Sequence, residues 1–459
     1  MQDAQMSTIE EVGSKAERLN RGCFCITIDR VALVEALNRE VGSQDFAQGL
    51  SKTHPSLFSN VPAFVPAALL AEMGRVVDAV EAAVSLPGYR EAALSWAPSI
   101  AGLDFGPAGV LMGYDFHVTA SGPKLIEVNT NAGGAFLNAP LAQAQRACCT
   151  EAQIPCEISH SQDFGPTIAD MFIDEWRRQR GAGCPATIAI VDDAPEEQYL
   201  FPEFRLAKAL LEKHGFEAVI ADAKELLFDG KTLLFDGRPI DLVYNRLVDF
   251  ALEEPRHAAL QAAYVGGNVV LTPNPRAHAL FADKRNLTLL SDSERLNRWG
   301  MAQSHLDVLR ATVPTTVIIS PGNADTLWQD RRNLFFEPAR GHGSKAAYRG
   351  DKITRKVWAE ILGREYVAQA YAAPGTRNVQ LYEGRAELKV DVRLYTFAGT
   401  VLLAAARLYQ GQTTNMRTPG GGFAPVLEIR SPLRGSQCQQ GGEVSQSRAD
   451  SVLTPSDIQ

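Results

Sequence analysis

The chain has 459 residues and a formal net charge of -8 at pH 7, with apolar and charged fractions of 45% and 21%. This length allows about two or three domains with a large core, and the two fractions are those of an ordinary globular protein. The acidic balance argues against nonspecific nucleic-acid binding, and no apolar run is long enough to span a bilayer, so we expect neither nucleic acid nor membrane as a partner.

Residues 1–105 are predicted to be mostly helical, with heptad-like apolar spacing in the segment 66–84. The start of the chain, 8–18, is charged and lacks the apolar stretch of a signal peptide. The seven cysteines include no Cys-x-x-Cys pair, which predicts reduced thiols in a cytoplasmic protein. The eight histidines are scattered singly, which argues against a zinc enzyme.

Residues 106–150 predict a β-hairpin followed by a helix of small residues around 141–149. Two runs of alternating apolar residues flank a Ser-Gly-Pro turn at 121–123.

The hairpin carries a candidate magnesium site. Asp115 lies on its first strand, and Glu127 and Asn129 share one face of the second strand, while Ile126 and Val128 are expected on the opposite face. Magnesium prefers such hard oxygen ligands, with phosphates completing its coordination. The alternative is a solvated strand face followed by a glycine-rich turn.

Residues 186–300 predict a parallel α/β sheet, because short apolar strands alternate with helices. Strands are expected at 187–191, 217–220, 241–246 and 269–272, with a helix at 203–214. The region resembles half of a Rossmann domain without a Gly-x-Gly-x-x-Gly loop. The segment Gly230-Lys-Thr232 ends like a phosphate-binding P-loop, but Glu225 stands where that motif needs its first glycine.

Residues 310–430 contain a glycine-rich loop at 339–350 after a strand at 334–338. Its glycines, Gly341 and Gly343, let backbone N–H groups approach phosphates, and the neighbouring Arg340 and Lys345 supply positive charge. A surface turn with a basic rim is the alternative. Residues 431–459 are predicted to be a disordered tail, because they are rich in Ser, Gln and Gly.

Two long strands are expected at 387–397 and from 401 to 409. These strands and the residues that follow them carry a second group of charged and polar side chains. Its members are Lys389, Asp391, Arg393, Arg407, Asn415 and Arg417. Several cations beside an amide and a glycine turn suit a developing phosphoryl charge. The alternative is a solvated outer face of the sheet.

In this order, these segments resemble the ATP-grasp ligases in a circularly permuted arrangement similar to the eukaryotic-type glutathione synthetases. The resemblance covers about 105–428 and places the metal hairpin first, where ordinary ATP-grasp chains place it last. It implies an α/β (α+β) ATP-grasp fold with a Rossmann-like substrate domain and an N-terminal helical region.

The resemblance implies an ATP-dependent, ADP-forming carboxylate–amine ligase that acts through an acyl phosphate, with ATP and Mg²⁺ as cofactors. Asp115, Glu127 and Asn129 would hold the metal, and Arg246 would hold a substrate carboxylate or the acyl phosphate. The implied catalytic residues are Arg393, Arg407, Asn415 and Arg246. The implied nucleotide-binding residues are Lys284, Glu337, Gly341, Gly343, Ser344, Lys345, Gln369, Tyr371, Lys389 and Asp391, with backbone groups of 369–371 meeting the adenine.

Glu337 departs from the family pattern, which has a lysine before the proline of this strand. A carboxylate near a triphosphate would repel it by about 1–3 kcal/mol, unless Lys345, Lys389 or a metal compensates. A non-catalytic nucleotide- or metabolite-binding relative and an ATP-dependent phosphotransferase therefore stay open, while a dinucleotide oxidoreductase lacks its glycine fingerprint. The expected partners are a small-molecule carboxylate and an amine, and the oligomeric state is open, with a homodimer as one option.

Overall fold

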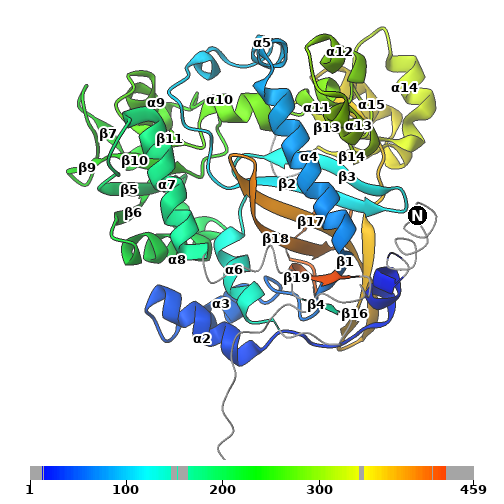
Figure 1. Cartoon of the computed structure of the whole chain (residues 1–459), viewed down its shortest axis with the longest axis horizontal. Helices are drawn as coiled ribbons and strands as arrows, with labels where there is room; N and C mark the ends of the chain where they lie inside the picture. Colours follow the sequence, from blue (N-terminus) through cyan, green and yellow to red (C-terminus); the bar gives the residue numbers. More distant parts are fainter. Residues whose placement is uncertain are drawn as a thin grey trace, which may run out of the picture.

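We describe a computed structural model that covers residues 13, 15–145, 152–153, 164–340, 346–415 and 417–430. Within these residues a central mixed sheet lies between a parallel α/β sheet and a smaller antiparallel sheet (Figure 1). The predicted tail, 431–459, lies outside the described residues.

The central sheet has eight strands in the order β1-β19-β18-β17-β2-β3, with β16 beside β17 and β4 beside β19. Their bounds are β1 Ala63–Pro66, β2 Met112–Thr119, β3 Gly122–Asn129, β4 Ala152–Gln153, β16 Gly375–Leu381, β17 Gly384–Phe397, β18 Thr400–Tyr409 and β19 Gly422–Ile429. The hairpin β2-β3 pairs with β17, and β1 runs parallel to β19, so segments far apart in sequence form one sheet.

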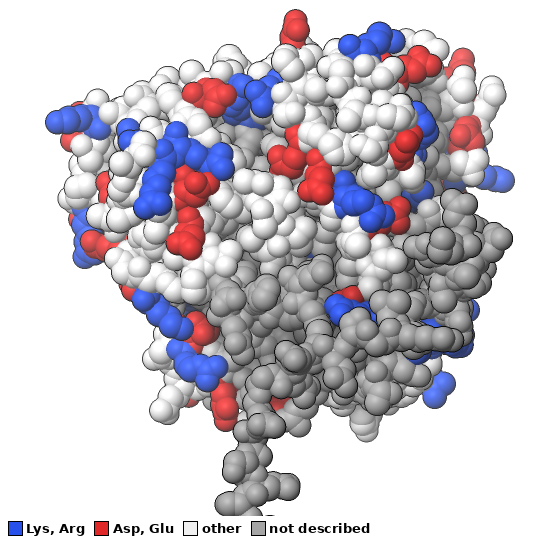
Figure 2. All heavy atoms as spheres, viewed as in Figure 1, with Lys and Arg blue, Asp and Glu red and all other residues white. Residues whose placement is uncertain are grey.

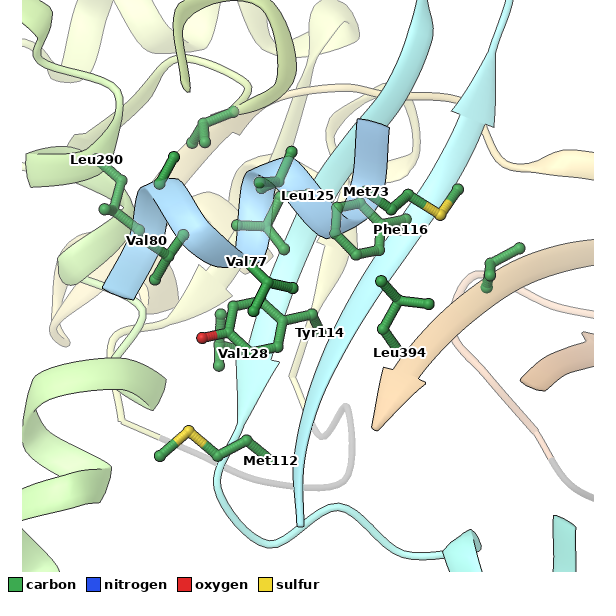
Figure 3. Packing of buried hydrophobic residues seen from close by; sticks show 14 of the residues in the cluster. Met73, Val77, Val80, Met112, Tyr114, Phe116, Leu125, Val128, Leu290 and Leu394 are labelled. Atoms are coloured by element: carbon green, nitrogen blue, oxygen red, sulfur yellow. The ribbon is translucent and has the colours of Figure 1, made fainter. Parts of the chain in front are cut away.

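One face of this sheet is covered by α4 (Ala67–Ser85), which crosses it in Figure 1. Apolar residues three and four positions apart make one stripe of this helix, and Met73 and Val77 from it pack on Tyr114 and Phe116 of β2 (Figure 3). Each fully buried aliphatic side chain contributes roughly 1.5–3 kcal/mol. Since neighbouring strand residues point to opposite faces, the residues between these aromatic rings face away from α4.

The parallel sheet has the order β11-β10-β5-β6, as the strand–helix alternation predicts. Its strands are β5 Thr187–Asp192, β6 Glu217–Asp222, β10 Leu242–Asn245 and β11 Val270–Thr272. The helices α7 Phe164–Arg180, α8 Phe201–Lys213 and α9 Ala258–Val265 surround it, and β7 Leu227–Phe228, β8 Leu233–Phe235 and β9 Arg238–Ile240 form a small separate sheet.

The antiparallel sheet has the order β12-β15-β13-β14. Its strands are β12 Thr316–Ile318, β13 Leu334–Pro338, β14 Tyr348–Arg349 and β15 Tyr366–Ala370. Trp358 of α15 (Arg355–Leu362) and Leu327 of α14 (Ala324–Asp330) pack on Phe336 in a core of their own.

The N-terminal region is mostly helical where the structure describes it, and a first helix runs through residues 15–22. The further helices there are α2 Arg30–Val41, α3 Phe46–Thr53, α4 and α5 Pro87–Ser95, with a 3-10 turn at Ser99–Gly102. The prediction of a mostly helical region did not include β1, because four apolar residues are too few to show a strand period.

The helix of small residues begins earlier than expected, as α6 Ala135–Gln143, after Gly134 with φ 107°. Residues 146–150 of the expected helix lie outside the described residues. The shorter helices are α10 Pro275–Ala277, α11 Asn286–Leu290, α12 Ser293–Arg298 and α13 Gln303–Thr312, with single turns at Pro195–Glu197, Ala223–Glu225, Pro255–His257, His278–Ala282, Arg331–Asn333 and Gly350–Lys352.

None of the helices in the described part of the chain is both long and apolar enough to cross a membrane. On the face shown in Figure 2, basic and acidic side chains are interspersed over the described surface.

Candidate functional site

A cleft lies between the central sheet and the small antiparallel sheet, on the face of β2 that points away from α4. Its lining includes these residues proposed from the sequence: Asp115, Glu127, Glu337, Gln369, Tyr371, Lys389, Asp391 and Arg407. The fold therefore brings together side chains from six strands, which no single motif of the sequence connects.

The proposed metal ligands converge as predicted. The Asn129 amide nitrogen donates hydrogen bonds to Asp115 Oδ2 at 3.1 Å and Glu127 Oε1 at 3.0 Å. The expectation for Ile126 is wrong: it lines the cleft beside Glu127. A bulge opposite Asp115 inserts one extra residue and breaks the alternation, since Asp115 pairs with Glu127 while the next residue of β2 pairs with Leu125.

Asp115 is 2% exposed and is held by two arginines. Arg393 donates from Nε and Nη2 to its two oxygens at 2.5 and 2.6 Å, and Arg407 Nη2 donates to Oδ2 at 2.8 Å. Arg407 also donates to Asp391 at 2.6 Å, and the Thr414 hydroxyl donates to the other oxygen of Asp391 at 2.9 Å. Burial lowers the pKa of Arg407, but the two carboxylates more than offset it and keep this guanidinium charged.

The pairing of strands β2, β17 and β18 brings these charged side chains together. Arg393 stands directly across from Asp115 on the neighbouring strand, and Asp391 stands directly across from Arg407. Cross-strand neighbours of opposite charge attract, and here they are also removed from water.

Lys284 connects the two sheets. Its ammonium group donates to Glu127 Oε2 at 2.9 Å and to Glu337 Oε1 at 2.8 Å. Burial raises the pKa of Glu127, but the Lys284 ammonium and the Asn129 amide more than offset this and hold that pKa well below its ordinary value. Burial raises the pKa of Glu337, with Lys284 opposing it. Lys284 thus supplies a compensating cation that was not expected, while the Lys389 ammonium donates to Gly411 O and the expectation for Lys345 falls outside the described residues.

The residues present fit a magnesium–nucleotide complex in donor chemistry. Asp115, Glu127 and Asn129 supply the hard oxygen ligands that Mg²⁺ prefers. At the other end of the cleft, Gln369 is 4% exposed and its amide nitrogen has no hydrogen-bond partner, although it is a donor. A buried donor left unpaired is costly, and an acceptor atom of a bound base would satisfy it.

The expected adenine contact with backbone groups of 369–371 stays a prediction. The backbone N–H groups of Ala370 and Tyr371 already donate to Thr315 O and Asn333 O, each at 2.8 Å. The side chain of Gln369, rather than these backbone groups, offers the available donor.

Other proposed residues lie elsewhere. Arg246 is 7% exposed beside Tyr244 and Glu203, and it is not part of the cleft lining. Asn415 is exposed, and its side-chain oxygen accepts a hydrogen bond from Arg417 N. Gly341, Gly343, Ser344 and Lys345 lie outside the described residues.

Several cleft residues were not predicted, among them two polar side chains, His117 and Thr414. The His117 ring donates from Nδ1 to Ala372 O at 2.7 Å, and Thr414 reaches Asp391. His117 follows Asp115 by two positions, so the strand period could have placed it on the same face. Thr414 lies in a loop, where no periodic signal exists.

A second group of side chains able to hold a metal is Asp193, Glu254 and His257, which contains a single histidine. Both ring nitrogens of His257 are already hydrogen-bonded, to Asp249 at 2.8 Å and to Asp193 at 2.9 Å. Arg256 forms an ion pair with Glu254 at 2.8 Å. The acidic side chains of this group therefore already have partners within the protein.

No family model and no curated protein matches the sequence. Among solved structures the chain resembles a glutathione synthetase-like effector from Globodera pallida in its apo form, with a TM-score of 0.55, 13% identity, and coverage of 88% of this chain and 98% of that one. It also resembles a gamma-glutamylcysteine synthetase-like protein from Methylobacillus flagellatus, with a TM-score of 0.45, 11% identity, and coverage of 78% and 88%. The predicted glutathione synthetase-like fold is confirmed, while its assignment to the ATP-grasp ligases, the circular permutation and the domain boundaries stay predictions.

Proposed function

We propose that this chain, which has the glutathione synthetase-like fold, is an ATP-dependent, ADP-forming carboxylate–amine ligase. The substrate would be a small peptide or an amino-acid-like acid, activated as an acyl phosphate and then captured by an amine. The observation that carries the proposal is the cleft between two sheets, in which carboxylates of β2, β3 and β17 face cations of β17 and β18.

Each end of the cleft has a role in binding the nucleotide. Asp115, Glu127 and Asn129 would hold Mg²⁺, which bridges phosphates and neutralises their charge when bound. Lys284 would donate to a phosphate oxygen, and Gln369 would donate to the base. To expose its oxygen to the metal, the Asn129 amide would rotate, because its nitrogen now points at both carboxylates.

The arginines suit the phosphoryl-transfer step. Arg407 and Arg393 lie at the metal end of the cleft and stay charged, so they would stabilise the negative charge that develops on the transferred group. Their positions are fixed in advance by Asp115 and Asp391, so little reorganisation would accompany the reaction. The acyl phosphate must be shielded from water until the amine attacks it.

The test is phosphate release from Mg²⁺-ATP by the full chain, with a panel of small acids in the presence and absence of amines. We expect release, together with an amide product, only when acid and amine are both present. Glu127→Gln should abolish release, whereas Glu365→Gln, a side chain that is 70% exposed, should not change it. Phosphate transfer to a hydroxyl acceptor without an amide product would refute ligation and favour a phosphotransferase.

A non-catalytic nucleotide-binding protein is the second candidate, and Glu337 favours it. The carboxylate stands where the resembled family has a lysine, and its partner, Lys284, is already engaged with two carboxylates. In that case Mg²⁺-ATP would bind without turnover for every acid and amine tested.

A further inference from the structure

The three side chains Lys284, Glu127 and Glu337 come from separate parts of the fold and meet between its two sheets. Glu127 belongs to β3 of the central sheet, Glu337 belongs to β13 of the small sheet, and Lys284 follows the turn His278–Ala282. The side chains of Lys284 and Glu337 are each 12% exposed, so both charges are largely removed from water.

We propose that Glu337 is a positioning residue that holds the Lys284 ammonium at the phosphate end of the nucleotide cleft. The inference rests on the proposed function. It gives Glu337 a role opposite to the one expected from charge alone: the carboxylate fixes the cation that a phosphate needs, rather than repelling the phosphate.

Donor geometry supports this role. A lysine ammonium has three N–H donors, and Lys284 directs two of them to Glu127 and Glu337. The third remains for a phosphate oxygen. Charge-assisted hydrogen bonds of this kind are about twice as strong as neutral ones, so the two carboxylates restrict a side chain that would otherwise be flexible.

Glu127 alone could not hold Lys284 throughout binding. As a proposed metal ligand, Glu127 must give its oxygen to a divalent cation, and the cation repels the ammonium. Glu337 offers Lys284 a second anchor at 2.8 Å on the other side of the cleft, so Lys284 can release Glu127 and stay in place.

Position 337 and Lys284 thus form a matched pair. The resembled family places a cation on this strand, and here the strand carries the anion while the cation comes from position 284. Lys389, another described lysine of the cleft, donates to Gly411 O and therefore does not take the place of Lys284.

A double-mutant cycle tests the inference, because Glu337→Gln should change the nucleotide affinity in opposite directions with and without Lys284. The dissociation constant of Mg²⁺ with the non-hydrolysable β,γ-imido analogue of ATP is measured by calorimetry for the full-length wild type, Glu337→Gln, Lys284→Gln and the double variant. We expect Glu337→Gln to weaken binding about tenfold in the wild-type background. In the Lys284→Gln background the same change should strengthen binding, because Glu337 would there be an unpaired anion facing phosphate.

Two controls separate folding from positioning. Glu365→Gln makes the same chemical change at an exposed site next to the small sheet and should leave binding unchanged. Glu337→Asp keeps the charge and should recover part of the lost affinity, and thermal unfolding of each variant verifies that it is folded.

The outcomes are distinct. Tighter or unchanged binding by Glu337→Gln in the wild-type background overturns the inference, and so does equal weakening in both backgrounds, which would make Glu337 a direct ligand of metal or nucleotide. A wild-type protein that binds no Mg²⁺-nucleotide refutes the proposed function itself.

Discussion

Asp115 and Glu127 both belong to the candidate metal site, yet removing their charges should have different effects on stability. Asp115→Asn leaves Arg393 and Arg407 without the carboxylate that both now contact within 2.8 Å. We expect this variant to be strongly destabilised even without metal or nucleotide.

The expected loss of stability can be estimated from the ion pairs that Asp115 makes. Opposite unit charges about 4 Å apart attract by about 4 kcal/mol at an effective dielectric constant near 20, and Asp115 has two such partners. Arg407 keeps Asp391, whereas Arg393 falls back on Gly133 O at 3.3 Å. Breaking a buried ion pair from one side costs about 3–5 kcal/mol, which we adopt as the expected loss for Asp115→Asn.

Glu127→Gln is the matched control on the same hairpin. Lys284 keeps its bond to Glu337, the new amide oxygen still accepts from Asn129, and the repulsion between two carboxylates is relieved. We expect a loss of about 1–2 kcal/mol from the ion pair with Lys284, well below that of Asp115→Asn, because the Glu127 side chain is 32% exposed.

The assay is urea-induced unfolding of the full chain without Mg²⁺ or nucleotide, followed by circular dichroism. An Asp115→Asn midpoint equal to that of the wild type would refute the argument that buried arginines depend on this carboxylate. An equally large loss in Glu127→Gln would show that the hairpin is sensitive to any substitution, irrespective of charge pairing.

Three further predictions concern the remainder of the fold. Burial raises the pKa of Glu81 from 4.5 to about 7. The folded state therefore keeps a proton that the unfolded chain loses, and stability falls as pH rises between these values. In urea unfolding, Glu81→Gln should raise the unfolding free energy by about 1–3 kcal/mol at pH 8 and by almost nothing at pH 4. Gly134→Ala would place Cβ 2.2 Å from the Phe423 ring at φ 107° and should cost more than about 3 kcal/mol, whereas Gly181→Ala, at φ 83° in open space, should cost only about 1 kcal/mol in the same assay. Arg377→Ala removes a fully buried guanidinium that donates to backbone carbonyls and should lower the unfolding free energy by about 3–5 kcal/mol.

Each of these has a clear contrary result. A pH dependence that persists in Glu81→Gln would assign it to other groups. Equal losses for the two glycine variants would show that backbone strain, not the ring contact, sets the cost. A stable Arg377→Ala protein would mean that water replaces the guanidinium without penalty.

Local patterns predicted the elements of the site better than their contacts. The period of two and the turn residues correctly placed Asp115, Glu127 and Asn129 on one face of a hairpin. The bulge at Ile126 could not be predicted, because an apolar residue at that position also fits a regular strand. The pairing of Asp115 with Arg393 joins residues 278 apart in sequence, and no local pattern specifies it.

Glu337 is a second residue whose contacts could not be predicted from the local sequence. The sequence marked this residue as a departure from the family pattern, but its compensating cation is Lys284, 53 positions away in a different segment. Charge balance could be judged only after the two sheets had been brought together.

The central sheet also sets an order of events during synthesis. Asp115 leaves the ribosome 278 residues before Arg393, an interval of tens of seconds at about 5–20 residues per second. During that time the hairpin has no strand β17 to pair with and Asp115 has neither of its arginine partners, whereas Lys284 is made earlier and can already pair with Glu127. The hairpin can therefore complete its pairing with the central sheet only after β17 has been synthesised.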